Sequence, residues 1–243
     1  MIANYSFTDG KPTCNNFVVN TYLYLAFSIC YMGLTIHFIH ELFFHGEQSY
    51  KKLINKIAPY FLMIFIFSLV LIVMISMQST FDTNSSSIVY NHFLWLLFIS
   101  TMAFVLTPRV VSSETEEYIG EELYIVIGIF VAMSSLVYMF PSFFSKSFSF
   151  MYPALLISLI VIIIAELYNY FTFKNKSQFI GIRRTISYVV IFIFSLYVSY
   201  DTAKVIQLSK MCINYPNYPK TSVTFFLDII NLFSRILFLK TNK

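Results

Sequence analysis

The chain has 243 residues, of which 58% are hydrophobic and 12% are charged, and its mean hydropathy is +0.71. Soluble domains carry about 25% charged residues, so a chain with 28 Phe and 18 Tyr lacks the polar side chains needed for a water-facing surface. The net charge of +4 is scattered between apolar runs, which argues against a nucleic-acid-binding protein, and three cysteines allow at most one disulfide and no thiolate metal cage. The composition predicts a polytopic membrane protein.

Apolar runs long enough to cross a bilayer follow one another along the whole chain. A transmembrane helix needs about 20 apolar residues, because each residue rises 1.5 Å through a hydrocarbon core about 30 Å thick. Such runs are expected to be helical, since lipid offers the backbone no hydrogen-bond partners. Six clear spans are predicted at about 17–39, 59–79, 91–107, 123–140, 148–171 and 185–205, and a seventh at about 221–239.

The seventh apolar run is interrupted by Asp228 and Arg235. A re-entrant or amphipathic segment after six spans is therefore the alternative to a seventh crossing. Pro108 is expected to close the third span and Pro141 the fourth, because proline ends helical hydrogen bonding. No linker or low-complexity stretch divides the chain, so we predict an all-α, seven-helix transmembrane bundle that forms a single domain over residues 1–243.

Lysine and arginine are distributed unevenly between the two sides of a seven-span chain. Cytoplasmic loops are enriched in these residues. The N-terminal side collects five of them: Lys11, Lys146, Lys204, Lys210 and Lys220. The opposite side collects eleven: Lys51, Lys52, Lys56, Arg109, Lys174, Lys176, Arg183, Arg184, Arg235, Lys240 and Lys243. The charge distribution alone thus predicts an N-terminus outside the cytoplasm and a C-terminus inside it.

Four ionisable side chains stand out at membrane depth: Glu166, Asp201, Asp228 and Arg235. A charge at the centre of a membrane helix costs about 2.5–3.5 kcal/mol on insertion scales, which makes each of them a candidate functional residue. Polar residues also recur along the last span at spacings of three and four, at Thr221, Thr224, Asp228, Asn231 and Arg235. This spacing places them on one helical face, which must point into the bundle or a wet cavity.

Asp201 and Asp228 are predicted to lie at a similar depth. Asp201 ends the sixth apolar run, one turn after Tyr197, and Asp228 lies about two turns into the seventh. The short loop between the two spans makes them antiparallel, so the two carboxyl groups can approach. Two neighbouring carboxylates in a low dielectric cannot both ionise easily and would share a proton. Protonated, the pair is a hydrogen-bonded latch; deprotonated, it repels itself and offers oxygens to a cation such as calcium.

A plainer interpretation carries equal weight on spacing alone. Asp201 would cap its helix or pair with Lys204, and Asp228 would pair with Arg235 or Asn231. In that case the polar residues support the structure of the last two helices and do not form a gate.

Other polar clusters favour structural roles. Glu166 is expected at the membrane interface rather than as a third carboxylate of the pair. His37, His40, Glu41 and His45 have a spacing typical of metal ligands, but no second cluster completes a zinc site, so solvation is expected. Five glutamates occupy one loop: Glu114, Glu116, Glu117, Glu121 and Glu122. A solvated helix start is their expected role, with a calcium-attracting vestibule as the alternative.

Two motifs flank the loop between the last two spans. The first is Phe194-Ser-Leu-Tyr-Val-Ser-Tyr-Asp201-Thr202, and the second is Phe225-Phe-Leu-Asp228-Ile-Ile-Asn231-Leu-Phe233. Together they resemble the sixth and seventh helices of the transmembrane Bax inhibitor motif family. Lys146-Ser-Phe-Ser-Phe, at the start of the fifth span, resembles the family more weakly. The resemblance is specific over residues 187–239, whereas over the first four spans it rests on span number and hydropathy.

The resemblance implies a bundle in which the last helix is surrounded by the other six. It also implies a pH-sensitive calcium leak, with Asp201 and Asp228 as paired latch residues that sense pH, gate the ion path and bind calcium transiently. Lys204, Asn231, Arg235, Tyr197 and Glu166 are the supporting polar residues. No cofactor and no enzymatic activity are expected, and calcium is the permeant ion.

For the cell, the resemblance implies calcium homeostasis and suppression of cell death. The expected location is an endoplasmic reticulum or Golgi-type membrane in a eukaryote or virus, or the plasma membrane in a bacterium. The expected partners are the bilayer, calcium, protons, and unidentified cell-death regulators or other membrane proteins.

The chain departs from the family in one motif and disagrees with it on orientation. Members with this latch can place a basic residue at the end of the second helix, where this chain reads Met77-Gln-Ser-Thr80; Lys204 or Arg235 would have to substitute. The family topology implies a cytosolic N-terminus, opposite to the charge distribution, and we favour the family topology here. Cys14 and Cys212 would then stay free, whereas in the inverted orientation they could pair.

Two other classes of protein compete with the calcium leak. A non-conducting structural or interaction protein with the same fold is the main alternative. An intramembrane aspartyl protease is disfavoured, because Phe226-Leu-Asp228 lacks the two glycines that let substrate backbone approach, and Pro153-Ala-Leu155 precedes the aspartates. A retinal receptor is disfavoured because the seventh span contains no lysine.

Overall fold

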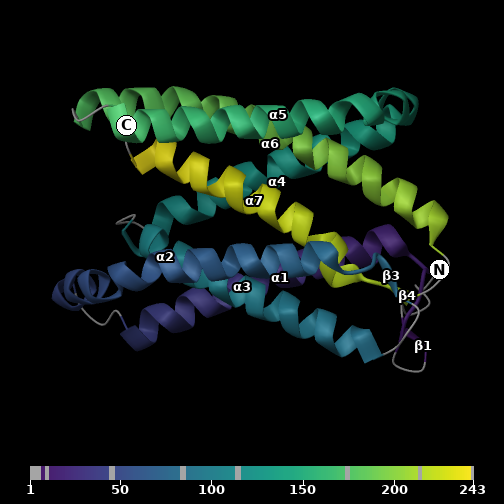
Figure 1. Cartoon of the computed structure of the whole chain (residues 1–243), viewed down its shortest axis with the longest axis horizontal. Helices are drawn as coiled ribbons and strands as arrows, with labels where there is room; N and C mark the ends of the chain where they lie inside the picture. Colours follow the sequence, from purple (N-terminus) through teal and green to yellow (C-terminus); the bar gives the residue numbers. More distant parts are fainter. Residues whose placement is uncertain are drawn as a thin grey trace. The chain divides into compact units, whose positions relative to one another are not determined.

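The computed structural model describes residues 7–8, 11–43, 47–82, 86–112, 116–172, 176–212 and 215–241. Within these ranges the chain is almost entirely helical (Figure 1). The helices are α1 (Phe17–Phe43), α2 (Glu47–Met77), α3 (Ser86–Ser112), α4 (Glu116–Met139), α5 (Pro141–Thr172), α6 (Lys176–Met211) and α7 (Tyr218–Thr241). The strands are two residues long each: β1 (Phe7–Thr8), β2 (Lys11–Pro12), β3 (Phe81–Asp82) and β4 (Tyr215–Pro216).

The prediction of an all-α polytopic membrane protein is confirmed. Six helices in the described part of the chain are long and apolar enough to cross a membrane: α1, α3, α4, α5, α6 and α7. In α2 the shorter apolar stretch Met63–Met77 lies within the described residues. The last helix is continuous over 24 residues, a length of about 36 Å at 1.5 Å per residue, which suffices to cross the hydrocarbon core. The continuity of α7 favours a crossing over the re-entrant alternative, and the seventh crossing stays a prediction.

Two prolines act differently from each other. Pro108 does end the candidate membrane span of α3, Ser87–Pro108, but the helix itself continues through this proline to Ser112. The fourth helix does end before Pro141, and that proline then opens α5. Proline is well tolerated in the first turn of a helix, where its missing N–H has no intrahelical partner.

The chain divides into two compact units. The first unit comprises residues 1–114 and 208–226, and the second comprises residues 115–207 and 227–243. Helices α6 and α7 each contribute residues to both units.

In the first unit, α3 packs against both α1 and α2. The α2–α3 connection and the α6–α7 connection meet in an antiparallel strand pair, with Phe81 opposite Pro216 and Asp82 opposite Tyr215. Buried aromatic residues fill the interior of this unit, and the rings of Phe98 and Phe226 meet edge to face at 6.0 Å. The strand pair and these rings hold the first turns of α7 in place.

In the second unit, α4 packs against α5, and polar contacts join α4 to α6. The hydroxyls of Ser134 and Thr202 lie 3.2 Å apart, and the Ser199 hydroxyl donates to the Met133 carbonyl at 3.3 Å. Hydrogen bonds of this kind join helices in lipid, where little hydrophobic force acts between them.

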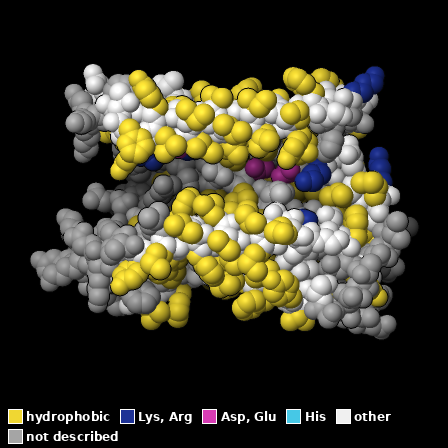
Figure 2. Space-filling model, viewed as in Figure 1, with side chains coloured by type: hydrophobic (Ala, Val, Ile, Leu, Met, Phe, Trp, Pro, Cys, Tyr) yellow, Lys and Arg dark blue, Asp and Glu magenta, His cyan; other side chains and the backbone are white. Residues whose placement is uncertain are grey.

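The burial of side chains follows the pattern expected in a membrane. On the face shown in Figure 2, hydrophobic side chains are spread over much of the described surface, and charged side chains are few. In α7, 61% of the apolar stretch is buried, against 11–33% in the other five long candidate spans. The apolar stretch of α7 is therefore the most buried of the six candidate spans.

Candidate functional site

Asp201 and Asp228 come together in the second unit. Only 6% of Asp201 and 4% of Asp228 is exposed, and the two carboxyl groups are close enough to interact electrostatically. Asp201 lies ten residues before the end of α6 at Met211, and Asp228 lies ten residues after the start of α7 at Tyr218. Ten residues of helix span about 15 Å, which is half the thickness of the hydrocarbon core. The structure therefore brings together the two aspartates that the sequence singled out, at matched positions on consecutive helices.

The Asp228 carboxyl group is incompletely hydrogen-bonded. Its Oδ2 atom is buried and has no hydrogen-bond partner among the described residues. Leaving a buried acceptor without a partner costs about 1–3 kcal/mol, and more when the group is charged. A proton held between the two aspartates, or a cation beside them, would satisfy this oxygen.

Two tyrosines interact with the aspartate pair, and a third lies beside one of them. Tyr197 interacts electrostatically with both aspartates, and Tyr200 interacts with Asp201. The ring of Tyr152, from α5, lies 5.9 Å from that of Tyr200. Tyr197 was expected from its place one turn before Asp201, whereas nothing in the sequence indicated that Tyr152 lies nearby. Phenolic oxygens give this site further polar groups in an otherwise apolar interior.

Three of the supporting residues of the sequence prediction, Arg235, Asn231 and Lys204, do not pair with the aspartates in the described part of the chain. Arg235 forms its ion pair with Glu166 of α5, and not with Asp228. The Asn231 amide donates to the Leu227 carbonyl at 2.8 Å, within its own helix. Lys204 is exposed. The interpretation in which Arg235 neutralises Asp228 is therefore wrong.

A second group of charges lies nearer the C-terminal end of α7. The Arg183 guanidinium lies 4.5 Å from the centre of the Phe238 ring and interacts electrostatically with both Arg235 and Glu166. Glu166 is half-buried and engaged, so it is neither a freely solvated interfacial side chain nor a member of the aspartate pair. Seven residues separate Arg235 from Asp228, so this group lies about 10 Å further along α7.

The glutamate loop is partly buried. Glu122 is fully buried, and neither carboxyl oxygen has a hydrogen-bond partner among the described residues. Glu121 pairs with Lys240. The expectation of a solvated face is thus wrong for Glu122. Glu114 lies outside the described residues, and the side chains of Glu116 and Glu117 are outside them too.

The histidines near the end of α1 form no metal centre in the described part of the chain. His40 and Glu41 are exposed and lie 4.0 Å apart. Across the described residues, no three or more His, Cys, Asp or Glu side chains gather as a metal site would require. His45 lies outside those residues.

A lysine does occupy the end of the second helix, but it comes from α7. The Lys220 ammonium donates to the carbonyls of Ser76, at 3.0 Å, and Gln78. A cation is favourable at a helix C-terminus, where carbonyl groups lack intrahelical partners. Nothing in the sequence connects Lys220 with residues 142 or 144 positions earlier, so this contact could not be predicted.

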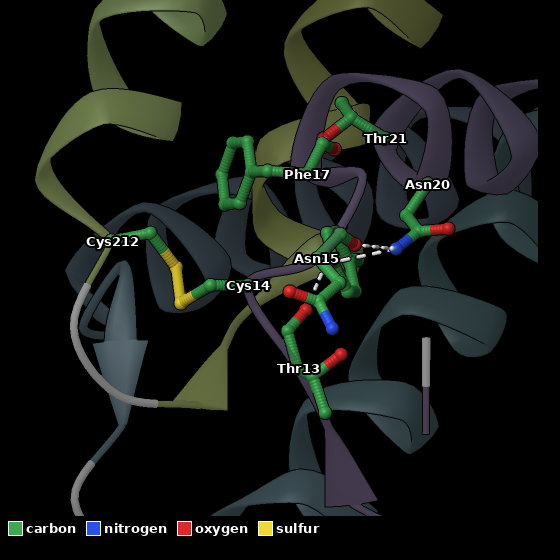
Figure 3. Close-up of a disulfide and its surroundings, with 8 residues drawn as sticks. Thr13, Cys14, Asn15, Phe17, Asn20, Thr21 and Cys212 are labelled. Atoms are coloured by element: carbon green, nitrogen blue, oxygen red, sulfur yellow. Dashed lines mark hydrogen bonds between the residues drawn. A yellow bond between two sulfur atoms is a disulfide. The ribbon is translucent and has the colours of Figure 1, made fainter. Parts of the chain in front are cut away.

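A disulfide between Cys14 and Cys212 ties the N-terminal segment to the end of α6 (Figure 3). The two Cα atoms are 5.8 Å apart, within the usual range for bonded cysteines. The expectation that both cysteines stay free is therefore wrong. Close by, the Tyr218 hydroxyl donates to the Thr13 carbonyl and accepts from the Asn20 amide at 3.0 Å.

These features define a multi-pass helical membrane protein with a buried pair of carboxyl groups on its last two helices. Over residues 14–242 the chain matches the family model described as Bax1-I, inhibitor of apoptosis-promoting Bax1. The chain belongs to this Bax inhibitor family. The match extends the resemblance of residues 187–239 to nearly the whole chain. A search of curated proteins gave no match.

Proposed function

We propose that this Bax inhibitor family protein is a pH-sensitive calcium leak whose gate is the Asp201–Asp228 pair. One observation supports this more than any other: two carboxyl groups from different helices are almost fully buried and interact electrostatically. Burying ionisable groups in a membrane protein is costly, and such groups usually serve ion or proton pathways.

Protonation controls the gate through the charge of the pair. With a proton shared between them, one carboxyl group donates a hydrogen bond to the other, and the pair links α6 to α7. When that proton leaves, two negative charges in a low dielectric repel each other and separate the helices. The leak is therefore expected to increase as the pH rises.

When the Asp201–Asp228 pair loses its proton and separates, its carboxylate oxygens can bind calcium. This ion takes six to eight oxygen ligands, so two carboxylates supply only part of its coordination, and water would supply most of the rest. Partial coordination suits an ion that must leave again. In a cell, such a leak would lower stored calcium, which supports roles in calcium homeostasis and in suppression of cell death.

The test is calcium flux through the full-length protein in liposomes that contain a calcium dye. Wild type is expected to leak several-fold faster at alkaline than at acidic pH. Asp201→Asn and Asp228→Asn each leave a single ionisable carboxyl group, so the pH dependence should be lost in both. Glu41→Gln, which removes an exposed carboxylate on α1, is the matched control and should behave as wild type. Absence of leak at every pH, or an unchanged pH profile in both aspartate variants, contradicts the proposal.

The second candidate is a non-conducting interaction protein of the same fold. The observation that favours it is the absence of a contact between the aspartates and a basic residue at the end of α2 in the described part of the chain. The lysine at that place is Lys220 of α7, and it contacts backbone carbonyls instead. This candidate expects no flux at any pH, with the aspartate substitutions changing only thermal stability. A protease would instead show cleavage of a membrane substrate that is lost in both aspartate variants.

A further inference from the structure

We infer that the Cys14–Cys212 disulfide forms in an oxidising compartment, so that the N-terminal segment and the α6–α7 connection lie on the non-cytosolic side of the membrane. The C-terminus then lies in the cytosol. This orientation is the reverse of the one that the family resemblance implied. It does not depend on whether the protein conducts calcium.

The disulfide fixes the two cysteines on the same side of the membrane. Cys14 comes three residues before α1, and Cys212 comes directly after α6 ends at Met211. An even number of crossings must therefore separate them, and the five candidate spans α1, α3, α4, α5 and α6 together with the shorter apolar stretch of α2 give six. The β3–β4 pair and the Lys220 contacts bring the α2–α3 connection to the same group of residues, after two crossings. Three connections thus agree on one side.

The chemistry of the bond identifies which side this is. Joining the two thiols releases two protons and two electrons, which must pass to the disulfide of a thiol–disulfide oxidant; that oxidant is reduced to a dithiol. Such oxidants operate in the secretory pathway, the periplasm and the cell exterior, whereas the cytosol keeps protein thiols reduced.

The basic residues give a second and independent indication. The side that carries the disulfide has five Lys and Arg residues in the sequence, and the opposite side has eleven. The positive-inside rule assigns the richer side to the cytoplasm. Charge and disulfide therefore lead to the same orientation, although one depends on loop composition and the other on two sulfur atoms.

Counting free thiols tests the disulfide. The full-length protein is made in eukaryotic cells, alkylated at harvest to block later oxidation, and then denatured. Without reduction, one thiol per chain should have been alkylated, that of Cys30, and reduction should release two more for labelling with a maleimide–polyethylene glycol. Cys14→Ser should raise the number alkylated without reduction to two, and Cys30→Ser, the matched control, should lower it to none. Three alkylated thiols in unreduced wild type would overturn the inference.

Protease protection in sealed microsomes tests the orientation. An N-terminal epitope tag should survive protease added from outside and should be digested once detergent opens the vesicles. Digestion of the tag in sealed vesicles would overturn the inference, even if the disulfide is present. Neither measurement involves ion flux, so failure here would leave the proposed leak standing, and failure of the leak would leave the orientation standing.

Discussion

At the scale of single residues, Asn217 shows how one side chain organises the start of the last helix. It directly precedes α7, and its Oδ1 atom accepts a hydrogen bond from the Lys220 backbone N–H at 3.0 Å. Its amide nitrogen donates to Gln78 Oε1 at 3.1 Å and to the Ser79 carbonyl at 3.2 Å. The same side chain therefore caps α7 and binds the α2–α3 connection.

Replacing Asn217 by alanine is expected to destabilise the protein. Loss of a helix cap costs about 0.5–2 kcal/mol, and the contacts to residues 78 and 79 are lost with it. A loss of 1 kcal/mol lowers the midpoint temperature of thermal unfolding by about 2–4 °C for a protein of this size. The midpoint temperature measured in detergent should therefore drop by several degrees. Asn231→Ala is the control: the Asn231 amide bonds only to its own helix, so its midpoint should change by less. Equal midpoints for Asn217→Ala and wild type would contradict this role.

Residues differ in how far their roles can be inferred from the sequence. Asp201 and Asp228 stand out because a carboxylate in an apolar run is rare, and the spacing from the shared loop predicts their equal depth. Lys220 and Glu122 have no such signal, since their surroundings depend on segments more than a hundred residues away. The disulfide could be expressed only as an alternative, because pairing requires an orientation that the charge distribution and the family topology assign differently.

At the scale of elements, the Glu166–Arg235 pair joins α5 to α7 beyond the aspartates. Glu166 is 35% exposed and Arg235 is 16% exposed at the side chain. The guanidinium group of Arg183, from α6, also interacts electrostatically with both Glu166 and Arg235. Side chains from three helices therefore meet here: two guanidinium groups and one carboxylate. The negative charge of Glu166 offsets the repulsion between the two positive guanidinium groups.

A double-mutant cycle on this pair should reveal coupling. Glu166→Gln is expected to destabilise more than Arg235→Gln, because it leaves Arg183 and Arg235 facing each other without an anion. The coupling free energy should be about 0.5–1 kcal/mol, reduced by the partial exposure of the pair. Chemical unfolding of the two single variants and the double variant in mixed micelles measures it. Additive effects, or a larger loss in Arg235→Gln, would refute the three-helix arrangement.

Helix positions are more predictable than helix ends. Each predicted span lies within a helix, apart from its last one or two residues in α2 and α4, because lipid requires both the apolar run and the internal hydrogen bonds. The helices extend beyond the runs, as in α6, which begins at Lys176 whereas the predicted span begins at about 185. Outside the hydrocarbon core, polar residues continue the backbone hydrogen bonds of the helix. Hydropathy does not predict how far these polar ends extend.

At the scale of the whole molecule, the number of crossings decides where the two termini lie. The apolar surface of α1, α3, α4, α5 and α6 requires lipid around them, and α7 is long enough to cross as well. The apolar stretch of α2, Met63–Met77, is shorter, and counting it as a crossing gives a predicted total of seven, which is odd. An odd total puts the N-terminus and C-terminus on opposite sides, whichever side faces the cytosol, whereas six crossings with a re-entrant last segment would put them on the same side.

Epitope tags at both ends, together with one inserted in the α6–α7 connection, can measure this parity. When antibody has access to only one side of the membrane, it should reach one of the two terminal tags and not the other. The inserted tag should behave like the N-terminal one, because six crossings separate them, and it thereby serves as the internal control. The physical reason is the continuity of α7: its 24 helical residues provide no break at which the chain could turn back, and Asp228 is accommodated by burial rather than by exit from the membrane. If both terminal tags are reached under the same condition while the inserted tag matches them, α7 does not cross, and the depth shared by Asp201 and Asp228 must then arise from a helix that enters and leaves on one side.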